Sequence, residues 1–387
     1  MNKPDGFIER LALTDAWAWL DACPTRVSSE TLPLDQAFGR ILYEPLIFTA
    51  DRPDRDIALI DGYALRAETT LGASPYNPLR LVLVPKDTAL QSGCAAACHA
   101  GETIPPGADA ALPLEAGEDT GGTLQVCDPV ARGASIGRKG EAAHIGDLAV
   151  PAGQRLGGPQ IALAASMGLT NLSVRQRPEV AVLLAGAKPP AAEAVGTALA
   201  GLIARDGGVA RPVHALSSAG PSQLVLLAGR SGWGEDDDAV DAVTAAGGRI
   251  DHHGIALTPG GSASLGWLGD APLLLLPGDP LSALVSYEVL AGRLLRRLAG
   301  RASDWPFSVQ RRALAAKIAS PVGVSEWVPL ACRGRSAAPL ALAPADGLAC
   351  YARADAFLVV PAGLEGYPSG EMVDVVMSGE VSKQELA

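Results

Sequence analysis

The sequence lacks long hydrophobic runs and has few charged or aromatic residues. No uninterrupted apolar stretch reaches the about 18 residues of a membrane-spanning helix. The first residues include Lys3, Asp5, Glu9 and Arg10 instead of the apolar segment of a signal peptide. Charged residues make up 19% and aromatic residues 4%, whereas hydrophobic residues make up 48% and the mean hydropathy is +0.20. We therefore expect a folded, soluble, cytoplasmic protein with no membrane partner.

Positive charge is also scarce. The 31 Lys and Arg residues against 42 Asp and Glu residues give a formal net charge of −11, which argues against a nucleic acid as the main partner. At about 150 residues per domain, the 387 residues predict two to three domains with cores of their own. A small scaffold held together by disulfides is excluded.

The cysteines and histidines are few and mostly scattered. Cys94 and Cys98 form the closest cysteine pair, with His99 next to them, but no second group of ligands follows at zinc spacing. Buried or incidental thiols are the simpler interpretation. His252 and His253 raise a second metal hypothesis, which strand geometry opposes because adjacent side chains point to opposite faces.

The first half of the chain reads as two helices followed by short strands. Apolar residues recur at helical spacing over residues 11–23 and again over residues 34–43. From about residue 44 to residue 150, Pro and Gly interrupt short apolar runs such as 81–84 and 124–127. This segment is expected to be β-rich and irregular.

After Pro178 the pattern changes to alternating strands and helices. We expect strands at residues 179–185, 213–216 and 223–228, helices at 191–204 and 236–246, and a long amphipathic helix at 281–298. This alternation predicts a mostly parallel sheet covered on both faces, whose ligands lie beyond the carboxyl ends of the strands. The loops in question are residues 186–190, 229–237 and 277–282. Beyond residue 305, strands at 356–360 and 372–377 predict a small terminal β domain.

One turn carries the strongest local signal. After an apolar strand and Pro277-Gly278, Asp279 can cap a helix whose first residue is Pro280. The N–H groups of Leu281, Ser282 and Ala283 are then expected to face the space above the sheet, where a helix start attracts anions such as phosphate. The alternative is a well-made strand-to-helix turn without a ligand.

Two further motifs are weaker alone. Asp61, Gly62 and Tyr63 follow an apolar run and could bind a metal or a polar ligand, although an ordinary Asp-Gly turn explains them as well. Residues 229–237 form a Gly-rich loop that could hold a phosphate, while its acids could simply favour the start of the next helix.

Taken in order along the chain, these motifs resemble the molybdopterin molybdenumtransferase family, which is related to the E domain of gephyrin. The resemblance covers residues 13–377 and rests on the following strings: DGYA at 61–64, GETIPPGADA at 101–110 with Glu115 after it, RKGE at 138–141, the spaced GD and AG at 146–153, ASMGL at 165–169, PGDPLSALVSYE at 277–288, ADAFLVVPAG at 354–363 and GEMVDV at 370–375.

The resemblance implies a multidomain α/β fold. Its expected parts are a linker domain of residues 1–45 and 136–177, a β-rich lobe of residues 46–135 that carries DGYA, a MogA-like parallel-sheet α/β domain of residues 178–304 that binds molybdopterin, and a C-terminal β-barrel-like domain of residues 305–387. It also implies an elongated homodimer whose site lies between the sheet domain of one subunit and the DGYA lobe of the other.

The same resemblance implies an activity. Family members bind adenylated molybdopterin, take molybdate, use a divalent cation such as Mg²⁺ and release AMP with molybdenum attached to the dithiolene. Other molybdenum cofactor biosynthesis proteins or a molybdoenzyme are the implied partners. The carried-over residues are Asp61, Asp237 and Glu115 as catalytic acids, Asp61 and Asp237 as metal ligands, and, for substrate, Gly62, Tyr63, Arg138, Lys188, Gly229, Ser231, Gly234, Pro277, Gly278, Asp279, Pro280 and Ser282.

Several family positions differ here. Acids are expected at the positions of Ala142, Ala187 and Lys188, and a threonine is expected at the position of Ala100. Lysines are expected at the positions of Thr258 and Gly261 and an asparagine at that of Asp279, and the Gly-rich loop contains Trp233. The segment between residues 208 and 224 is too short for the usual helix. Losing one well-placed charge typically costs about 10² to 10³ in rate, so the chain needs replacements, for which Arg230, Lys188, Arg138 and Lys139 are candidates unless they are plain surface charges. The alternative function is a non-catalytic carrier or scaffold for the pterin cofactor that partners a catalytic paralogue.

Overall fold

The computed structural model describes residues 9–25, 28–186, 191–342 and 347–378. The chain forms two compact units: unit 1 contains Met1–Thr31 and Ser173–Ala387, and unit 2 contains Leu32–Leu172. Across the described part of the chain, none of the helices combines the length and the apolar character needed to span a bilayer. The division into four domains stays a prediction.

Unit 1 is built on a six-stranded mixed sheet with the order β14–β13–β15–β19–β18–β16. The strands β14, β13, β15 and β19 run parallel, as predicted, whereas β18 and β16 are antiparallel additions that the sequence pattern did not predict. The bounds are β13 (Glu179–Leu184), β14 (Val209–Val213), β15 (Leu224–Ala228), β16 (Arg249–His253), β18 (Ser264–Leu268) and β19 (Ala271–Leu276).

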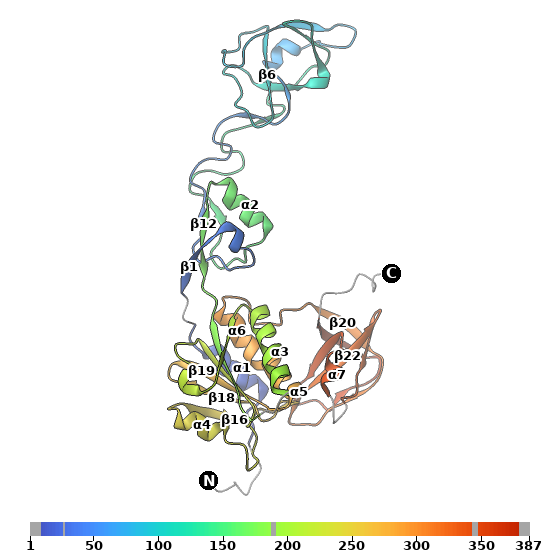
Figure 1. The fold of residues 1–387 in the computed structure, drawn as a ribbon. Helices are drawn as coiled ribbons and strands as arrows, with labels where there is room; N and C mark the ends of the chain where they lie inside the picture. Colours follow the sequence, from blue (N-terminus) through green and yellow to red (C-terminus); the bar gives the residue numbers. More distant parts are fainter. Residues whose placement is uncertain (1–8, 26–27, 187–190, 343–346, 379–387) are drawn as a thin grey trace. The chain divides into compact units, whose positions relative to one another are not determined.

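Helices cover both faces of this sheet, because alternate strand residues are apolar on both sides. Val180 and Leu226 face a core shared with α1, α3, α5 and α6, while Ala181 and Leu227 face a core shared with α4 and the short turn η4 (Figure 1). The bounds are α1 (Leu13–Ala22), α3 (Ala191–Asp206), η4 (Leu216–Ser218), α4 (Ala239–Ala245), α5 (Pro280–Ser286), η5 (Tyr287–Ala291) and α6 (Gly292–Leu298).

Two expected elements are wrong. Residues 34–43 form only the short turn η1 (Leu34–Gln36), because Gly39 adopts a φ of +75° and its N–H bonds to Leu156 O instead of continuing a helix. The strand expected at 213–216 is β14 at Val209–Val213, and its Pro212 is tolerated because β14 is an edge strand. Only η4 connects β14 to β15, as the short spacing predicted.

The long helix predicted at 281–298 is present but contains the wider turn η5. This π-helical turn directs Tyr287 and Glu288 into the protein, where both are buried. The Glu288 carboxylate accepts two hydrogen bonds from Arg205, at 2.6 and 2.9 Å, and the Tyr287 hydroxyl donates to Asp206 at 3.0 Å. Arg296 lies 3.2 Å from the same Asp206 carboxylate. A buried charge network therefore joins the ends of α3 and α6.

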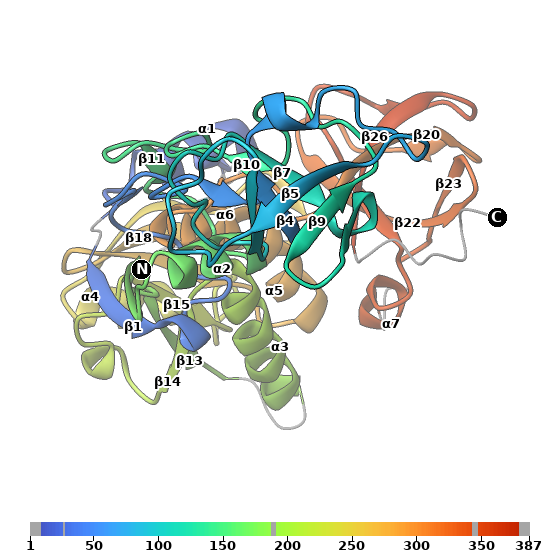
Figure 2. The same ribbon diagram turned by 90° about the horizontal axis from the view of Figure 1, so that it is seen from above.

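A β-barrel follows the sheet in unit 1, as predicted. The ring β22–β23–β20–β26–β24 is closed by pairing between β22 and β24 (Figure 2). Trp327 and Phe357 from this barrel pack into the core shared with the sheet helices. The bounds are β17 (Leu257–Thr258), β20 (Val309–Leu314), β21 (Ile318–Ala319), β22 (Ser325–Arg333), β23 (Ser336–Pro339), α7 (Gly347–Tyr351), β24 (Ala356–Val360), β25 (Gly366–Tyr367) and β26 (Met372–Met377).

Unit 2 consists mostly of short strands, as predicted for residues 44–150. Its main sheet has the order β7–β4–β6–β5–β9–β8, and β2 pairs with β11, β3 with β10 and β1 with β12. The bounds are β1 (Ser29–Pro33), β2 (Leu46–Ile47), β3 (Ile57–Ala58), β4 (Gly62–Leu65), η2 (Ala67–Thr70), β5 (Leu79–Leu83), β6 (Cys94–Cys98), β7 (Ala110–Pro113), η3 (Leu114–Ala116), β8 (Gly117–Asp119), β9 (Thr123–Val126), β10 (Ile136–Gly137), β11 (Leu148–Val150), α2 (Gly158–Ser166) and β12 (Asn171–Arg175).

Candidate functional site

The carboxyl ends of three parallel strands meet at one edge of the unit 1 sheet. Leu184 at the end of β13 is in register with Ala228 at the end of β15, and Ala228 is in register with Leu276 at the end of β19. The Gly-rich loop (residues 229–238) and the anion turn (residues 277–282) therefore begin side by side. In parallel sheets this edge is where ligands bind, so we take it as the candidate site.

Gly229 lets the loops approach one another closely. Its φ is +106°, and a Cβ at this position would lie 2.0 Å from the carbonyl oxygen of Ala185. Gly278 contacts it from the anion turn, since a Cβ on Gly278 would lie 3.4 Å from the Gly229 Cα. Arg230 continues the left-handed turn with a φ of +54° and forms an ion pair with Asp238 at 2.8 Å. Backbone therefore packs closely on backbone at Gly229 and Gly278, while the Arg230 side chain covers Gly186, whose Cβ would lie 2.5 Å from Arg230 Nε.

The Gly-rich loop holds its own acid. Asp237 accepts a hydrogen bond of 2.7 Å from the N–H of Gly234, and a Cβ on Gly232 would lie 2.5 Å from the same carboxylate oxygen. A side chain at either glycine would therefore displace the Asp237 carboxylate from its present position. One oxygen of Asp237 is already occupied, which limits it as a ligand for a cation.

The anion turn has the predicted cap but not the predicted free N–H groups. Asp279 accepts a hydrogen bond of 2.9 Å from the N–H of Ser282, and Pro280 occupies the first helical position. The N–H of Ala283 bonds to the Asp279 carbonyl at 2.9 Å. For Ser282 and Ala283 the expectation of N–H groups that face a ligand is wrong, because the cap and the first helical turn use them; for Leu281 it stays a prediction.

A cluster beside these loops joins residues that sequence reasoning treated separately and adds Arg10, which it missed. Ser231 is buried, its hydroxyl lies 3.0 Å from that of Ser262, and its carbonyl accepts a hydrogen bond of 3.0 Å from His253 Nε2. Trp233 stacks on His253 with ring centroids 5.0 Å apart, and Arg10 lies over the indole. The His252-His253 pair suggested a metal hypothesis for His253, but not its contacts with Ser231 and Trp233. Nothing in the sequence connects Arg10 to this loop.

The DGYA motif lies in unit 2 at the start of β4. Asp61 accepts a hydrogen bond of 2.9 Å from the N–H of Ala100 and lies 3.4 Å from His99 Nδ1. Gly62 leaves no room for a side chain, because a Cβ would lie 2.0 Å from Leu112 O. Tyr63 is only 9% exposed and packs in the core of the lobe. Asp61 is therefore the exposed polar group of the motif.

A pocket of about 350 Å³ borders this motif. It is lined by Cys98 and Gly101, which flank the two residues that contact Asp61, and by Lys86 and Glu102, which form an ion pair at 2.9 Å. All the named side chains belong to the same lobe. Asp61 itself does not line the pocket.

Glu115, Arg138 and Lys188 are the remaining site residues predicted from the sequence. Glu115 is exposed on η3. Arg138 forms an ion pair with Asp56 at 2.6 Å, and the backbone N–H of Lys139 together with this guanidinium holds the pKa of Asp56 below its usual range. Lys188 lies outside the described residues. The basic pair at 138–139 is therefore largely neutralised by unit 2 itself.

Comparison with known proteins agrees with this arrangement. A family model described as the MoeA N-terminal region, domains I and II, matches residues 11–168. Molybdopterin molybdenumtransferase 2 of Mycobacterium tuberculosis is 30% identical over 334 residues, covering 77% of this chain and 82% of that protein. Molybdopterin molybdenumtransferase 1 of the same organism is 28% identical over 404 residues, covering 88% and 92%.

A crystal structure of a molybdopterin biosynthesis MoeA protein from Pyrococcus horikoshii is also similar. It has a TM-score of 0.78 and 27% sequence identity, and it covers 95% of this chain and 99% of that one. The chain belongs to the molybdopterin molybdenumtransferase family. The predicted family and the multidomain α/β fold are thereby confirmed, and the homology places the chain in molybdenum cofactor biosynthesis.

The family resemblance implies a magnesium ion, whose ligands would be carboxylates. Within the described ranges, no three His, Cys, Asp or Glu side chains gather as a metal site would require. The proposed metal ligands Asp61 and Asp237 belong to unit 2 and unit 1, respectively. Neither unit alone offers a set of described residues that fits the ion, so the role of Asp61 and Asp237 as metal ligands stays a prediction.

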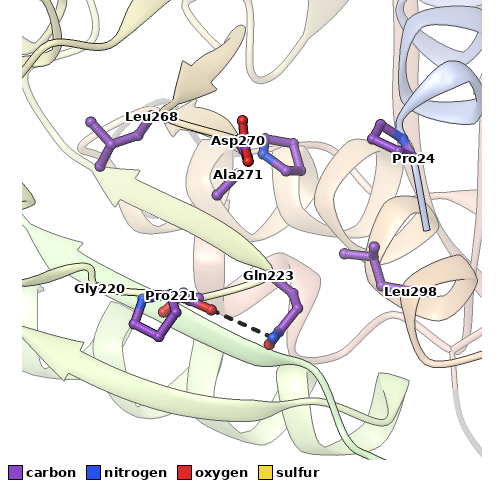
Figure 3. A pocket seen from close by; sticks show the side chains of 11 residues that line it. Pro24, Gly220, Pro221, Gln223, Leu268, Asp270, Ala271 and Leu298 are labelled. Carbon is purple, nitrogen blue, oxygen red and sulfur yellow. Dashed lines mark hydrogen bonds between the residues drawn. The ribbon is translucent and has the colours of Figure 1, made fainter. Parts of the chain in front are cut away.

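The family site is distinct from another pocket of unit 1. That pocket, of about 330 Å³, lies at the opposite edge of the sheet, where Gln223 precedes β15 and Ala271 begins β19 (Figure 3). The Gln223 amide reaches the Pro221 carbonyl only at 3.5 Å. None of the site residues predicted from the family lines this pocket, so it is no part of the candidate site.

Proposed function

We propose that this chain is a molybdopterin molybdenumtransferase that binds adenylated molybdopterin and inserts molybdenum from molybdate with release of AMP. The observation that carries this proposal is the meeting of the Gly-rich loop and the anion turn beside Gly229 and Gly278 at the carboxyl edge of the sheet. Backbone without side chains at this point allows a phosphorylated ligand to approach closely. Membership of the family supplies the substrate class.

The chemistry balances without a redox step. Cleavage of the phosphoanhydride bond uses one water and yields AMP and molybdopterin. When the two dithiol sulfurs bind molybdenum, their protons leave with one oxo ligand of molybdate as water. Molybdenum keeps its oxidation state. The protein has to hold the two substrates together and stabilise the anionic groups, which well-placed cations and N–H donors do.

An AMP-release assay tests this function. With adenylated molybdopterin, molybdate and Mg²⁺, the full-length protein is expected to release AMP steadily, and release is expected to stop when molybdate is left out. Calorimetry on the same preparation measures binding of the adenylate directly. A protein that binds no adenylated molybdopterin, while a standard family member does so in parallel, contradicts the proposal.

The second candidate function is a pterin carrier without catalysis. It is favoured by the pairing of charges that were expected to act: Arg230 with Asp238, Arg138 with Asp56, and Asp237 with its own loop. A carrier binds the adenylate with comparable affinity but releases no AMP above the rate without protein. The two measurements above therefore separate the enzyme from the carrier, and a molybdoenzyme or another cofactor biosynthesis protein is the proposed recipient of the product.

We further propose that the chain forms a homodimer through unit 2. Ile47 and Leu148 face each other across the β2–β11 pair and are 40% and 58% exposed. Directly opposed residues share one face of such a ladder, so this short sheet presents an apolar surface to solvent, and surfaces of this kind mark interaction sites.

Light scattering on the full chain tests the dimer. The wild type is expected at twice the monomer mass of 39.5 kDa, and the double variant Ile47→Asp, Leu148→Asp is expected at the monomer mass, because two facing carboxylates would be buried against an apolar partner. Thr123→Asp, on β9 of the same unit, is the charge control. A wild type of monomer mass would contradict the proposed homodimer and would leave the family assignment unchanged.

A further inference from the structure

The N-terminal segment brings an arginine to the edge of the candidate site. The N–H of Leu11 bonds to Gly254 O at 3.0 Å, and the N–H of Ala256 bonds to Leu11 O at 2.8 Å. These two bonds fix Leu11, the residue that follows Arg10, against the chain that leaves β16. Arg10 and the sheet both belong to unit 1.

The Arg10 side chain fills space that two glycines leave. Its Nη1 lies 3.0 Å from the place of a Cβ on Gly261, and its Cγ lies 3.4 Å from the place of a Cβ on Gly254. Any side chain at position 261 would therefore meet the guanidinium. The Arg10 guanidinium therefore occupies the space that a side chain at position 261 would take.

An aromatic stack holds this guanidinium in place. Arg10 Cζ lies 5.4 Å from the centre of the Trp233 ring, within the range of a cation–π contact. Trp233 in turn stacks on His253, whose Nε2 bonds to Ser231 O. A planar cation packed in this way loses little further freedom when it binds an anion.

The charge of Arg10 is not neutralised by the part of the protein that the structure describes. No carboxylate of the described residues is recorded within 4.0 Å of it, in contrast to Arg230, which is paired with Asp238. Ser262 follows Gly261 directly, and its hydroxyl lies 3.0 Å from that of Ser231. The guanidinium thus packs against the residue before Ser262, and a planar cation of this kind suits a tetrahedral oxyanion.

The geometry points to Arg10 as an anion-binding residue of the candidate site, with Trp233 and His253 as its positioning residues. The inference rests on the proposed function, which supplies two oxyanions of the same chemistry: the phosphate of the adenylate and molybdate. It gives the N-terminal segment a role in the site, in addition to the loops at residues 186–190, 229–237 and 277–282 where the sequence predicted the ligand.

Calorimetry with separate probes tests this assignment. AMP, sodium molybdate and adenylated molybdopterin are titrated into the full-length wild type and into Arg10→Gln, Arg10→Met and Arg10→Lys. Losing a hydrogen-bonded charge is expected to weaken binding of the contacted probe by about 10-fold to 100-fold in the Gln and Met variants, and the dependence of affinity on salt is expected to flatten. Arg10→Lys is expected to recover part of the affinity.

Arg333→Gln is the matched control. It removes the same charge from unit 1 but lies at the far end of β22, whose residue Glu326 pairs with Thr258. Seven residues of strand at about 3.3 Å each put Arg333 roughly 23 Å from that pairing. Binding of all probes is expected to be unchanged in this variant.

The outcomes separate the inference from the proposed function. A loss confined to AMP and the adenylate assigns Arg10 to the phosphate, and a loss confined to molybdate assigns it to molybdate. Wild-type affinity and salt dependence in both Arg10→Gln and Arg10→Met overturn the inference while the proposed function stands. A wild type that binds no probe overturns both. Arg10→Met keeps the aliphatic stem against Trp233, so an equal loss in the two variants excludes disturbed packing as the cause.

Discussion

Replacing Glu288 with alanine is expected to lower the free energy of unfolding of unit 1 by about 3 to 5 kcal/mol. Removing one partner of a buried ion pair typically has this cost. Glu288 is 2% exposed and accepts two hydrogen bonds from the Arg205 guanidinium, while Asp206 accepts two others. Because Asp206 stays paired with Arg205 in the variant, we expect the lower end of this range. Burial by itself lowers the pKa of Arg205, but the paired carboxylates raise it overall, so the arginine stays charged in the variant.

Tryptophan fluorescence during urea unfolding measures this loss. All six tryptophans belong to unit 1, so the fluorescence transition reports that unit. Glu179→Ala is the control, since its 3.4 Å pair with Arg211 is half exposed, and pairs of this kind contribute about 1 kcal/mol or less. A Glu288→Ala variant as stable as Glu179→Ala would show that the buried network does not hold α3 against η5.

The elements of the sheet domain that follow from local patterns could be predicted. Apolar strand runs gave β13, β15 and β19, and the residues at the end of β19 gave the cap that Asp279 makes. The direction of β16 and β18 could not be predicted, because β16 is mostly polar and the short β18 does not encode which neighbour it pairs with. The missing helix at residues 34–43 has a similar cause, since Gly39 bonds to a segment more than a hundred residues away.

The candidate site was predictable only where single turns define it. Gly229, Gly278 and Asp279 are recognisable from the residues next to them. The engagement of Asp237 by Gly234 depends on how the loop closes, and the place of Arg10 depends on a contact with residues more than 200 positions away. For this reason the sequence motifs indicated Arg230, Lys188, Arg138 and Lys139 as replacement cations and did not indicate Arg10.

Gly229→Ala is expected to destabilise unit 1 by at least about 3 kcal/mol and to weaken ligand binding at the edge of the sheet. The residue has a φ of +106°, and the new Cβ would lie 2.0 Å from Ala185 O. Because the Ala185 oxygen belongs to the backbone, either the end of β13 or the start of the Gly-rich loop has to move. The N–H of Gly229, which bonds to Leu276 O at 2.9 Å, is expected to exchange faster with solvent deuterium.

Gly247→Ala separates the two costs in this prediction. Gly247 also has a positive φ, +82°, but nothing lies within 4 Å of its Cβ position, so the variant carries only the left-handed strain of about 1 to 2 kcal/mol. The difference between the two variants in the urea midpoint then measures the close approach of the loops. Equal midpoints would mean that Gly229 serves the turn alone. In that case, the backbone contact between the ends of β13 and β15 would no longer explain why a glycine stands at the centre of the site.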